Sequence, residues 1–268
     1  MNNPLTNISS VPVRSSVISS LYPDIKVKNM KIAALVQKGE LIRLKKGMFV
    51  VSPELSGVPL SLELIANHLY NPSYVSMSSA LRYYGLIPEA VYTIQSMTTK
   101  HSRNFENELG VFTYNTISSK AFSVGLRRVQ RDERVAFIIA SPEKALCDLI
   151  ANSPNVNLRY LKEAEAYLAE DIRLDLDEFA KMNPDIFEEY IAVGKKPTSI
   201  RTLLKLLRKS RASESRVKLA WAMPSTADIM QMNNDIYGEM LQSYDLSTDQ
   251  ARRNAIFEVN QQIVLNGL

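Results

Sequence analysis

The sequence predicts an α+β fold with an N-terminal winged helix-turn-helix, a mixed α/β middle region and a helical C-terminal region. Three observations support this prediction. A helical pattern and a lysine-tipped hairpin pattern follow one another between residues 27 and 51. Apolar runs rich in β-branched residues recur between residues 91 and 140. Beyond residue 154 the apolar residues recur at helical spacing. With 268 residues, 46% of them hydrophobic, the chain is long enough for two or three domains.

Residues 1–53 are assigned to the winged helix, mainly from the segment VKNMKIAALVQKGELIRLKKGMFVV at 27–51. A helix comes first, with an apolar stripe at three-to-four-residue spacing. The side chains expected on its buried face are Val27, Met30, Ile32, Leu35 and Val36. Gly39 follows the last turn, where glycine adopts a left-handed C-cap at low cost. An earlier helix is predicted from Arg14 to Leu21, and a further short one is expected within residues 1–10.

Two short β-rich runs flank Lys45-Lys46-Gly47, which predicts the tip of a hairpin. In a winged helix the recognition helix enters the DNA major groove, and the wing contacts the backbone beside it. We therefore expect the helix residues to contact base edges and phosphates, whereas the wing cations contact phosphates alone. The expected DNA-binding residues are Lys26, Lys28, Asn29, Lys31, Arg43, Lys45 and Lys46.

The charge pattern agrees with this interpretation. From residue 14 to residue 46 the chain has eight Lys or Arg and two acidic residues. Clustered positive charge binds duplex phosphates without sequence preference. The same charges also fit a solvated helix and hairpin that bind no ligand. The order of helix, glycine cap and basic hairpin favours DNA.

A second domain is assigned to residues 58–210, because Ser52-Pro53 and the SGVP segment at 56–59 indicate a boundary. Strands are predicted at 91–98, 111–117 and 135–140. Ser141-Pro142-Glu143 is a typical helix start. Further helices are predicted at 61–70, 79–84, 158–170, 175–182, 184–193 and 199–209. Residues 211–231 are predicted to be a linker, and 232–268 a helical tail.

Four segments together resemble the AbiEi family of antitoxins from type IV toxin–antitoxin systems, over roughly the first 210 residues. They are GELIRLKKGMFVV at 39–51, YVSMSSALRYYGLIPE at 74–89, VYTIQSMTTK at 91–100 and ASPEKALCDLI at 140–150. The resemblance implies a winged helix that binds operator DNA and represses its own operon. It also implies a C-terminal domain that neutralises a nucleotidyltransferase-like toxin in phage defence by abortive infection.

The tail from Met232 resembles the N-terminus of the partner family, the AbiEii toxins. In that family the nucleotide-binding glycines and metal-binding aspartates come later, and none is found in this tail. The resemblance therefore implies a fragment without the toxin's chemistry. A coincidental amphipathic helix is the alternative.

Candidate catalytic and metal-binding groups have simpler structural interpretations. Asp175-Leu-Asp177 has the spacing of a nucleotidyltransferase metal site but no preceding glycine-rich turn, so Asp177 is expected to cap a helix. Cys147 lies among apolar neighbours and is expected in the core. Glu143 is expected to complement the helix dipole. Two histidines and one cysteine do not make the usual structural zinc site. We expect no enzyme activity, no cofactor and no metal.

A second basic block, residues 195–218, has nine Lys or Arg and one acidic residue. Within it, the helix around 200–209 has an apolar stripe opposite a basic one. The basic stripe fits either a solvated face or a docking surface, and we take it as the candidate toxin-neutralising surface. Its residues are Arg201, Lys205, Arg208 and Lys209.

We therefore expect a cytoplasmic antitoxin whose partners are operator DNA and a nucleotidyltransferase-like toxin, with direct or indirect contact to the toxin. No run of about 20 apolar residues predicts a membrane span. A homodimer on DNA is left open. The alternative is a plain winged-helix transcriptional regulator whose middle domain senses a ligand or dimerises.

Overall fold

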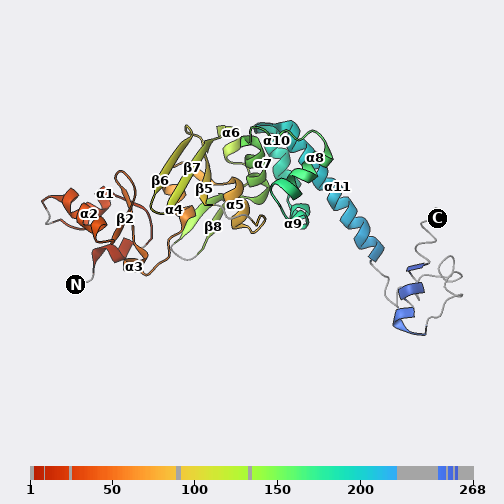
Figure 1. The fold of residues 1–268 in the computed structure, drawn as a ribbon, viewed down its shortest axis with the longest axis horizontal. Helices are drawn as coiled ribbons and strands as arrows, with labels where there is room; N and C mark the ends of the chain where they lie inside the picture. Colours follow the sequence, from red (N-terminus) through yellow and green to blue (C-terminus); the bar gives the residue numbers. More distant parts are fainter. Residues whose placement is uncertain are drawn as a thin grey trace. The chain divides into compact units, whose positions relative to one another are not determined.

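The computed structural model describes residues 3–8, 10–23, 26–88, 92–131, 135–221, 247–251, 253–255 and 257–258; for 213–221 it describes the backbone alone. The chain divides into two compact units, residues 1–211 and 212–268. The first unit mixes helices and strands, in agreement with the predicted α+β class, and contains every residue discussed below as a site (Figure 1).

The N-terminal elements form a small sheet with short helices around it. The sheet has three antiparallel strands in the order β1-β3-β2. These are β1 (Val13–Arg14), β2 (Leu41–Lys45) and β3 (Met48–Val51). The helices are the 3-10 helix η1 (Pro4–Ile8), α1 (Ser15–Ser20), α2 (Lys28–Gln37) and α3 (Pro53–Ser56).

Two glycines lie where the sequence predicted a helix end and a hairpin tip, and for Gly39 the predicted left-handed geometry is confirmed. Gly39, after α2, has a φ of 71°, and Gly47, between β2 and β3, has a φ of 75°. Both values lie in the left-handed region, which costs glycine little because it has no Cβ. The helix therefore ends before β2, and the hairpin turns at the predicted position.

One part of the predicted stripe on α2 is wrong. Ile32 and Leu35 are buried and Val36 is half-buried, but Met30 is 70% exposed and Val27 is 53% exposed. The reason is geometric, since Met30 precedes Ile32 by two residues and so lies on the opposite side of a helix with 3.6 residues per turn. Val27 is the N-cap and precedes the helix.

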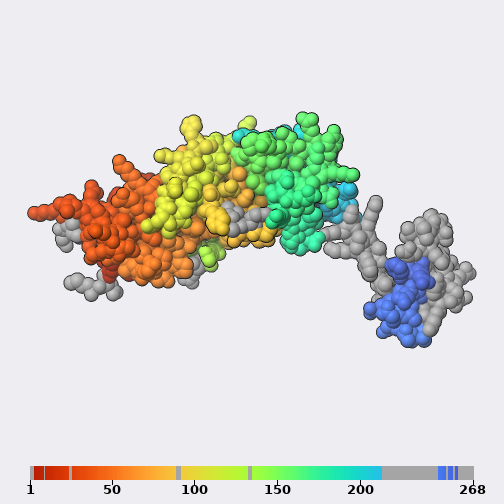
Figure 2. All heavy atoms as spheres, in the orientation of Figure 1, coloured from red at the N-terminus to blue at the C-terminus, as the bar shows by residue number. Residues whose placement is uncertain are grey.

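The small core of this region is separate from the main core. It contains Leu5, Ile18, Ile32, Leu35, Leu41, Phe49 and Val51. Leu44 and Val50 of the hairpin belong instead to the main core. The hairpin therefore packs on both sides, against α2 and against the domain that follows it. In the space-filling view the N-terminal residues and those of the following domain form one continuous surface (Figure 2).

The middle of the first unit is a six-stranded mixed sheet in the order β6-β7-β5-β4-β9-β8. Its strands are β4 (Ser73–Val75), β5 (Thr93–Thr98), β6 (Arg103–Asn107), β7 (Gly110–Thr116), β8 (Leu126–Gln130) and β9 (Ala136–Ala140). Strand β5 is parallel to β7, and β4 is parallel to β9, whereas β4–β5, β6–β7 and β8–β9 are antiparallel.

The sequence predicted β5, β7 and β9 but missed β6 and β8. Both missed strands lie at the edges of the sheet, and most of their residues are exposed or half-buried. Their sequences, RNFEN and LRRVQ, are therefore polar and lack the apolar run that identifies an inner strand.

Helices surround this sheet and continue after it. They are α4 (Leu62–Leu69), α5 (Met77–Tyr83), α6 (Ser119–Phe122), α7 (Pro142–Asn152), α8 (Leu161–Ala166), the π-helical turn η2 (Tyr167–Asp171), α9 (Leu176–Lys181), α10 (Pro184–Val193) and α11 (Pro197–Trp221). Helix α7 begins as predicted, with Ser141 Oγ accepting from Lys144 N and Pro142 in the first turn.

The predicted linker and tail lie largely outside the described residues. Helix α11 is helical through Trp221, so the first half of the predicted linker 211–231 is helix, and 222–231 are not described. Of the predicted tail 232–268, residues 249–251, 253–255 and 257–258 are described and helical. Among the described residues, no helix is both long and apolar enough to span a bilayer.

Candidate nucleic-acid interface

Helix α2 presents one side to solvent over its whole length. The exposed residues along this side are Asn29, Met30, Ala33, Ala34 and Gln37. Apart from Asn29 and Gln37 these side chains are small or apolar, and none carries a charge. This side can therefore approach another surface closely and contact it through amide groups and methyl groups.

The predicted DNA-binding cations fall into two groups in the structure. Lys26, Lys28, Arg43 and Lys46 are exposed, as is Asn29. The guanidinium carbon of Arg43 lies 5.6 Å from the centre of the Phe49 ring, which supports its position on the hairpin. These four cations are available to an external anion.

Lys31 and Lys45 are half-buried and already have partners. The ammonium group of Lys31 lies 4.8 Å from the centre of the Tyr22 ring. The ammonium group of Lys45 donates a hydrogen bond to the carbonyl of Leu69, at the end of α4, and lies 5.4 Å from the ring of Phe105. Lys45 therefore points towards the sheet, and its predicted role as an outward wing contact does not fit its position.

The contact between the hairpin and the sheet brings predicted cations together with His68, Lys100 and Arg103, which the sequence did not single out. Asn107 Nδ2 donates to Leu44 O over 3.1 Å, and this bond joins β6 to β2. Beside it lies a pocket with a volume of about 550 Å³. Its basic lining residues are Arg14, Lys45, Lys46, His68, Lys100 and Arg103. No local pattern could have identified them as a set, because they come from four separate stretches of the chain.

The basic stripe on α11 is exposed, whereas its apolar stripe is buried. Ile200, Leu203, Leu204 and Leu207 are in the core. Arg201, Lys205 and Lys209 are exposed, and the structure gives them no partner among the described residues. Arg208 is also exposed but pairs with Glu188 of α10. Three of the four predicted residues are therefore open to an external partner.

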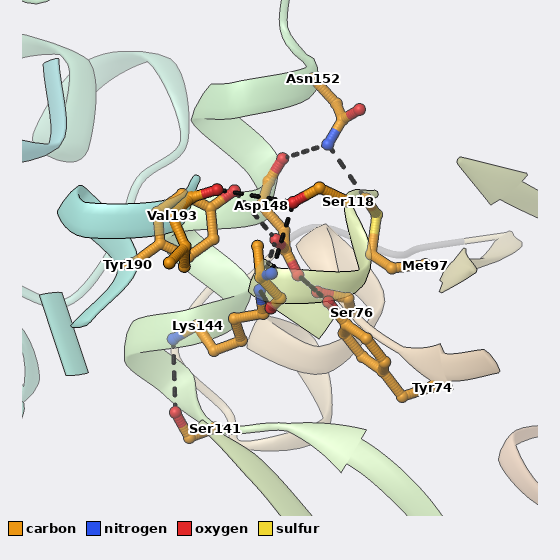
Figure 3. A network of polar contacts seen from close by, with 11 residues as sticks. Tyr74, Ser76, Met97, Ser118, Ser141, Lys144, Asp148, Asn152, Tyr190 and Val193 are labelled. Carbon is orange, nitrogen blue, oxygen red and sulfur yellow. Dashed lines mark hydrogen bonds and ion pairs between the residues drawn. The ribbon is translucent and has the colours of Figure 1, made fainter. Parts of the chain in front are cut away.

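Two of the four segments that carry the family resemblance, 74–89 and 140–150, meet in a buried polar network (Figure 3). Tyr74 lies in β4 and Ser76 directly follows this strand, and their hydroxyls donate to Asp148 Oδ2 over 2.9 and 2.8 Å. Tyr190 of α10 donates to Asp148 Oδ1 over 3.2 Å. Lys144 Nζ lies 3.2 Å from the same oxygen, and both charged side chains are 0% exposed.

The ammonium group of Lys144 has two further neutral partners in the core. Lys144 also donates to Ala121 O over 2.8 Å and lies 4.4 Å from the ring of Tyr190. Burial raises the pKa of Asp148, against the opposing effect of Lys144 and the hydroxyls, and burial lowers the pKa of Lys144. Both charged side chains are fully buried, and the bonds of the network connect α7 to β4 and α10.

The chain matches no model of a known protein family and no curated protein. The resemblance to AbiEi antitoxins therefore rests on the four sequence segments alone. In the structure, hydrogen bonds join two of these segments.

Other candidate chemical groups are explained by local structure. Asp175, and not Asp177 as predicted, is the N-cap of α9 and accepts from the backbone N–H groups of residues 177 and 178. Glu143 is buried and accepts from Asn183 N over 2.8 Å, a role the helix-dipole interpretation did not foresee. Cys147 is buried as predicted, and burial raises its pKa, which disfavours a thiolate. Among the described residues, no three His, Cys, Asp or Glu side chains are grouped to hold a metal ion.

Proposed function

We propose that this chain is an antitoxin of a type IV toxin–antitoxin system that represses its own operon through a winged helix and neutralises a nucleotidyltransferase-like toxin. The observation that carries the DNA-binding half is an exposed, uncharged side of α2 followed directly by a cationic hairpin. The winged-helix interpretation is also supported by the surrounding elements, namely η1, α1 and the three-stranded sheet. A recognition helix and a wing require such a scaffold.

In this proposal α2 is the recognition helix and lies in the major groove. Asn29 is in its first turn, where recognition helices contact base edges. An asparagine side chain recognises adenine through N6 and N7, and apolar side chains such as Met30 and Ala33 contact the methyl group of thymine. Lys26, Lys28, Arg43 and Lys46 bind the flanking phosphates. These four cations thus supply affinity, and the uncharged side of α2 supplies sequence preference.

Replacing Asn29 by alanine is expected to reduce sequence preference while leaving general affinity nearly unchanged. The cost on the promoter of the chain's own operon is expected to be about 1–3 kcal/mol, the value of one bidentate base contact. Fluorescence anisotropy on this duplex and on a scrambled duplex measures both quantities. Lys28→Ala is the matched control, since it should weaken both complexes equally. If Asn29→Ala weakened binding to both duplexes equally, the proposal that α2 recognises bases would be wrong.

The antitoxin half of the proposal follows from the family resemblance and uses the exposed basic side of α11. Reversing three charges with Arg201→Glu, Lys205→Glu and Lys209→Glu is expected to abolish neutralisation if an acidic partner docks there, because like charges across an interface cost several kcal/mol. Growth of cells that co-express the neighbouring toxin gene is the readout.

The matched control is an equal charge change on other exposed residues, namely Lys120→Glu, Arg128→Glu and Lys162→Glu. This control should still rescue growth, and promoter binding by the α11 variant should be unchanged. Full rescue by the α11 variant at normal expression would show that neutralisation uses another surface or needs no contact.

A second candidate function is a transcriptional regulator with a ligand-sensing domain. The cationic pocket between the hairpin and the sheet favours it, because a ligand bound there would contact the DNA-binding region and the sheet together. Sequencing the neighbouring DNA distinguishes the candidates, since an adjacent toxin gene is required by the antitoxin proposal alone.

A further inference from the structure

The pocket between the hairpin and the sheet concentrates positive charge. Arg14 comes from β1, Lys45 and Lys46 from the hairpin, Lys100 from the loop after β5 and Arg103 from β6. Its lining contains no acidic residue. Within the part of the chain that the structure describes, no carboxylate forms an ion pair with any of these five cations. The pocket therefore holds uncompensated charge in a concave site.

Three of the five cationic groups, those of Lys45, Lys100 and Arg103, have neutral partners that hold them in position. Lys100 Nζ donates to Asn71 O over 2.6 Å and lies 5.4 Å from the ring of Tyr70. The guanidinium of Arg103 lies 5.0 Å from the centre of the Phe105 ring, which Lys45 also approaches to 5.4 Å. Cation–π contacts orient a charge without neutralising it. These three side chains are thus ordered before a ligand arrives, which reduces the entropy cost of binding.

These cations also repel one another. Burial and the charges of Arg103, Arg14 and Lys100 together lower the pKa of Lys45. A cavity lined by charge of one sign concentrates counter-ions of the other sign. An anion that contacts several of these groups at once would relieve the repulsion, and the attraction increases with the number of negative charges that it carries.

The volume of the pocket limits the size of the anion that can bind in it. A volume of about 550 Å³ lies within the range of small-molecule sites, which is about 300–1,000 Å³. A DNA duplex presents a convex surface, so it can pass the mouth of such a pocket but cannot fill it. Cations partly cover the faces of Tyr70 and Phe105. These rings are therefore less accessible for stacking on a ligand than the cations are for contacting an anion.

We propose that this pocket binds a small anion with two or more linked phosphate groups, such as a nucleoside polyphosphate or inorganic polyphosphate. Arg14, Arg103, Lys45, Lys46 and Lys100 supply the charge-assisted hydrogen bonds to its oxygens. Lys46 belongs both to this pocket and to the proposed DNA-binding set. A bound anion would therefore compete with duplex phosphates for it, a consequence that rests on the proposed function.

Isothermal titration calorimetry on the full chain, without DNA, tests the pocket. Inorganic tripolyphosphate and ATP are each titrated, with adenosine as the uncharged comparison. We expect saturable one-to-one binding of both anions and none of adenosine. The variant Lys100→Gln with Arg103→Gln should weaken binding about 100-fold, because it removes two charge-assisted hydrogen bonds at about tenfold each. Binding of ATP in preference to tripolyphosphate would identify a nucleotide as the natural ligand, provided that tripolyphosphate also binds.

The matched control is Lys120→Gln with Arg128→Gln, which removes the same charge from exposed residues outside the pocket lining. It should bind both anions as the unaltered chain does, and thermal unfolding checks that both variants are folded. Equal weakening by the control, or no saturable binding of tripolyphosphate at about 1 mM, would overturn the proposal. So would binding of ATP without binding of tripolyphosphate. None of these outcomes depends on whether the chain binds DNA.

Discussion

Replacing Asp148 by asparagine is expected to reduce the free energy of unfolding by about 3–5 kcal/mol, because it leaves the ammonium group of Lys144 buried and unpaired. Asp148 accepts hydrogen bonds from Tyr74, Ser76 and Tyr190 as well, and an amide cannot satisfy all three hydroxyls and the ammonium group. The total stability of a domain is about 5–15 kcal/mol, so this single change removes a large part of it. Urea unfolding followed by circular dichroism measures the difference.

Two further variants separate the ion pair from simple packing. Lys144→Met combined with Asp148→Asn should cost less than the sum of the two single changes, since neither charge is then left alone. Glu178→Gln, in the exposed pair with Lys181, should cost far less than Asp148→Asn, because solvent screens an exposed ion pair. If Asp148→Asn had the same free energy of unfolding as the unaltered chain, the network would contribute nothing to stability.

Replacing Lys26, Lys28, Arg43 and Lys46 together by alanine is expected to weaken DNA binding on the order of 1,000-fold at about 0.1 M salt. Each of these exposed side chains is assigned one phosphate. Removing one such cation should reduce the slope of log affinity against log salt by about 0.9. The four changes should therefore reduce the slope by about 3.6, measured by fluorescence anisotropy over a salt series.

Lys45→Ala is the matched control within the same hairpin, because its ammonium group is bound to Leu69 O and points into the pocket. It should change the slope much less than any one of the four. An unchanged slope in the fourfold variant would show that duplex phosphates bind elsewhere on the chain. Deleting residues 1–53 is a poorer test, since it would remove Leu44 and Val50 from the main core.

The elements of the chain differed in how well they could be predicted. Helices α4, α7, α9 and α10 were predicted within a few residues, because each has an apolar stripe and most have a polar cap or an N-terminal proline. Strands β6 and β8 were missed because edge strands need no apolar run. The error at Met30 had a different cause, since Met30 precedes Ile32 by two residues and so falls outside the three-to-four-residue spacing of a buried helix face.

The candidate site was only partly visible in the sequence. Charge clustering identified the exposed cations of α2 and the hairpin, and it also identified Arg201, Lys205 and Lys209 on α11. It could not distinguish Lys45 from Lys46, although they are adjacent. The difference arises because Lys46 is at the hairpin tip, whereas Lys45 faces the end of α4, 24 positions along the chain.

Local patterns were sufficient to predict most of the helices, the hairpin turn at Gly47, the blocks of charge and the helix start at Ser141. All of these depend on residues within a few positions of one another. Only the tertiary structure shows which charged side chains are buried, which are paired and which line a common pocket. Lys144 becomes part of the core because Tyr74, 74 positions from Asp148, reaches the same carboxylate. Arg14 and Arg103 share a pocket because the hairpin packs against β6. Such contacts depend on the packing of distant segments, and no short stretch of sequence encodes them.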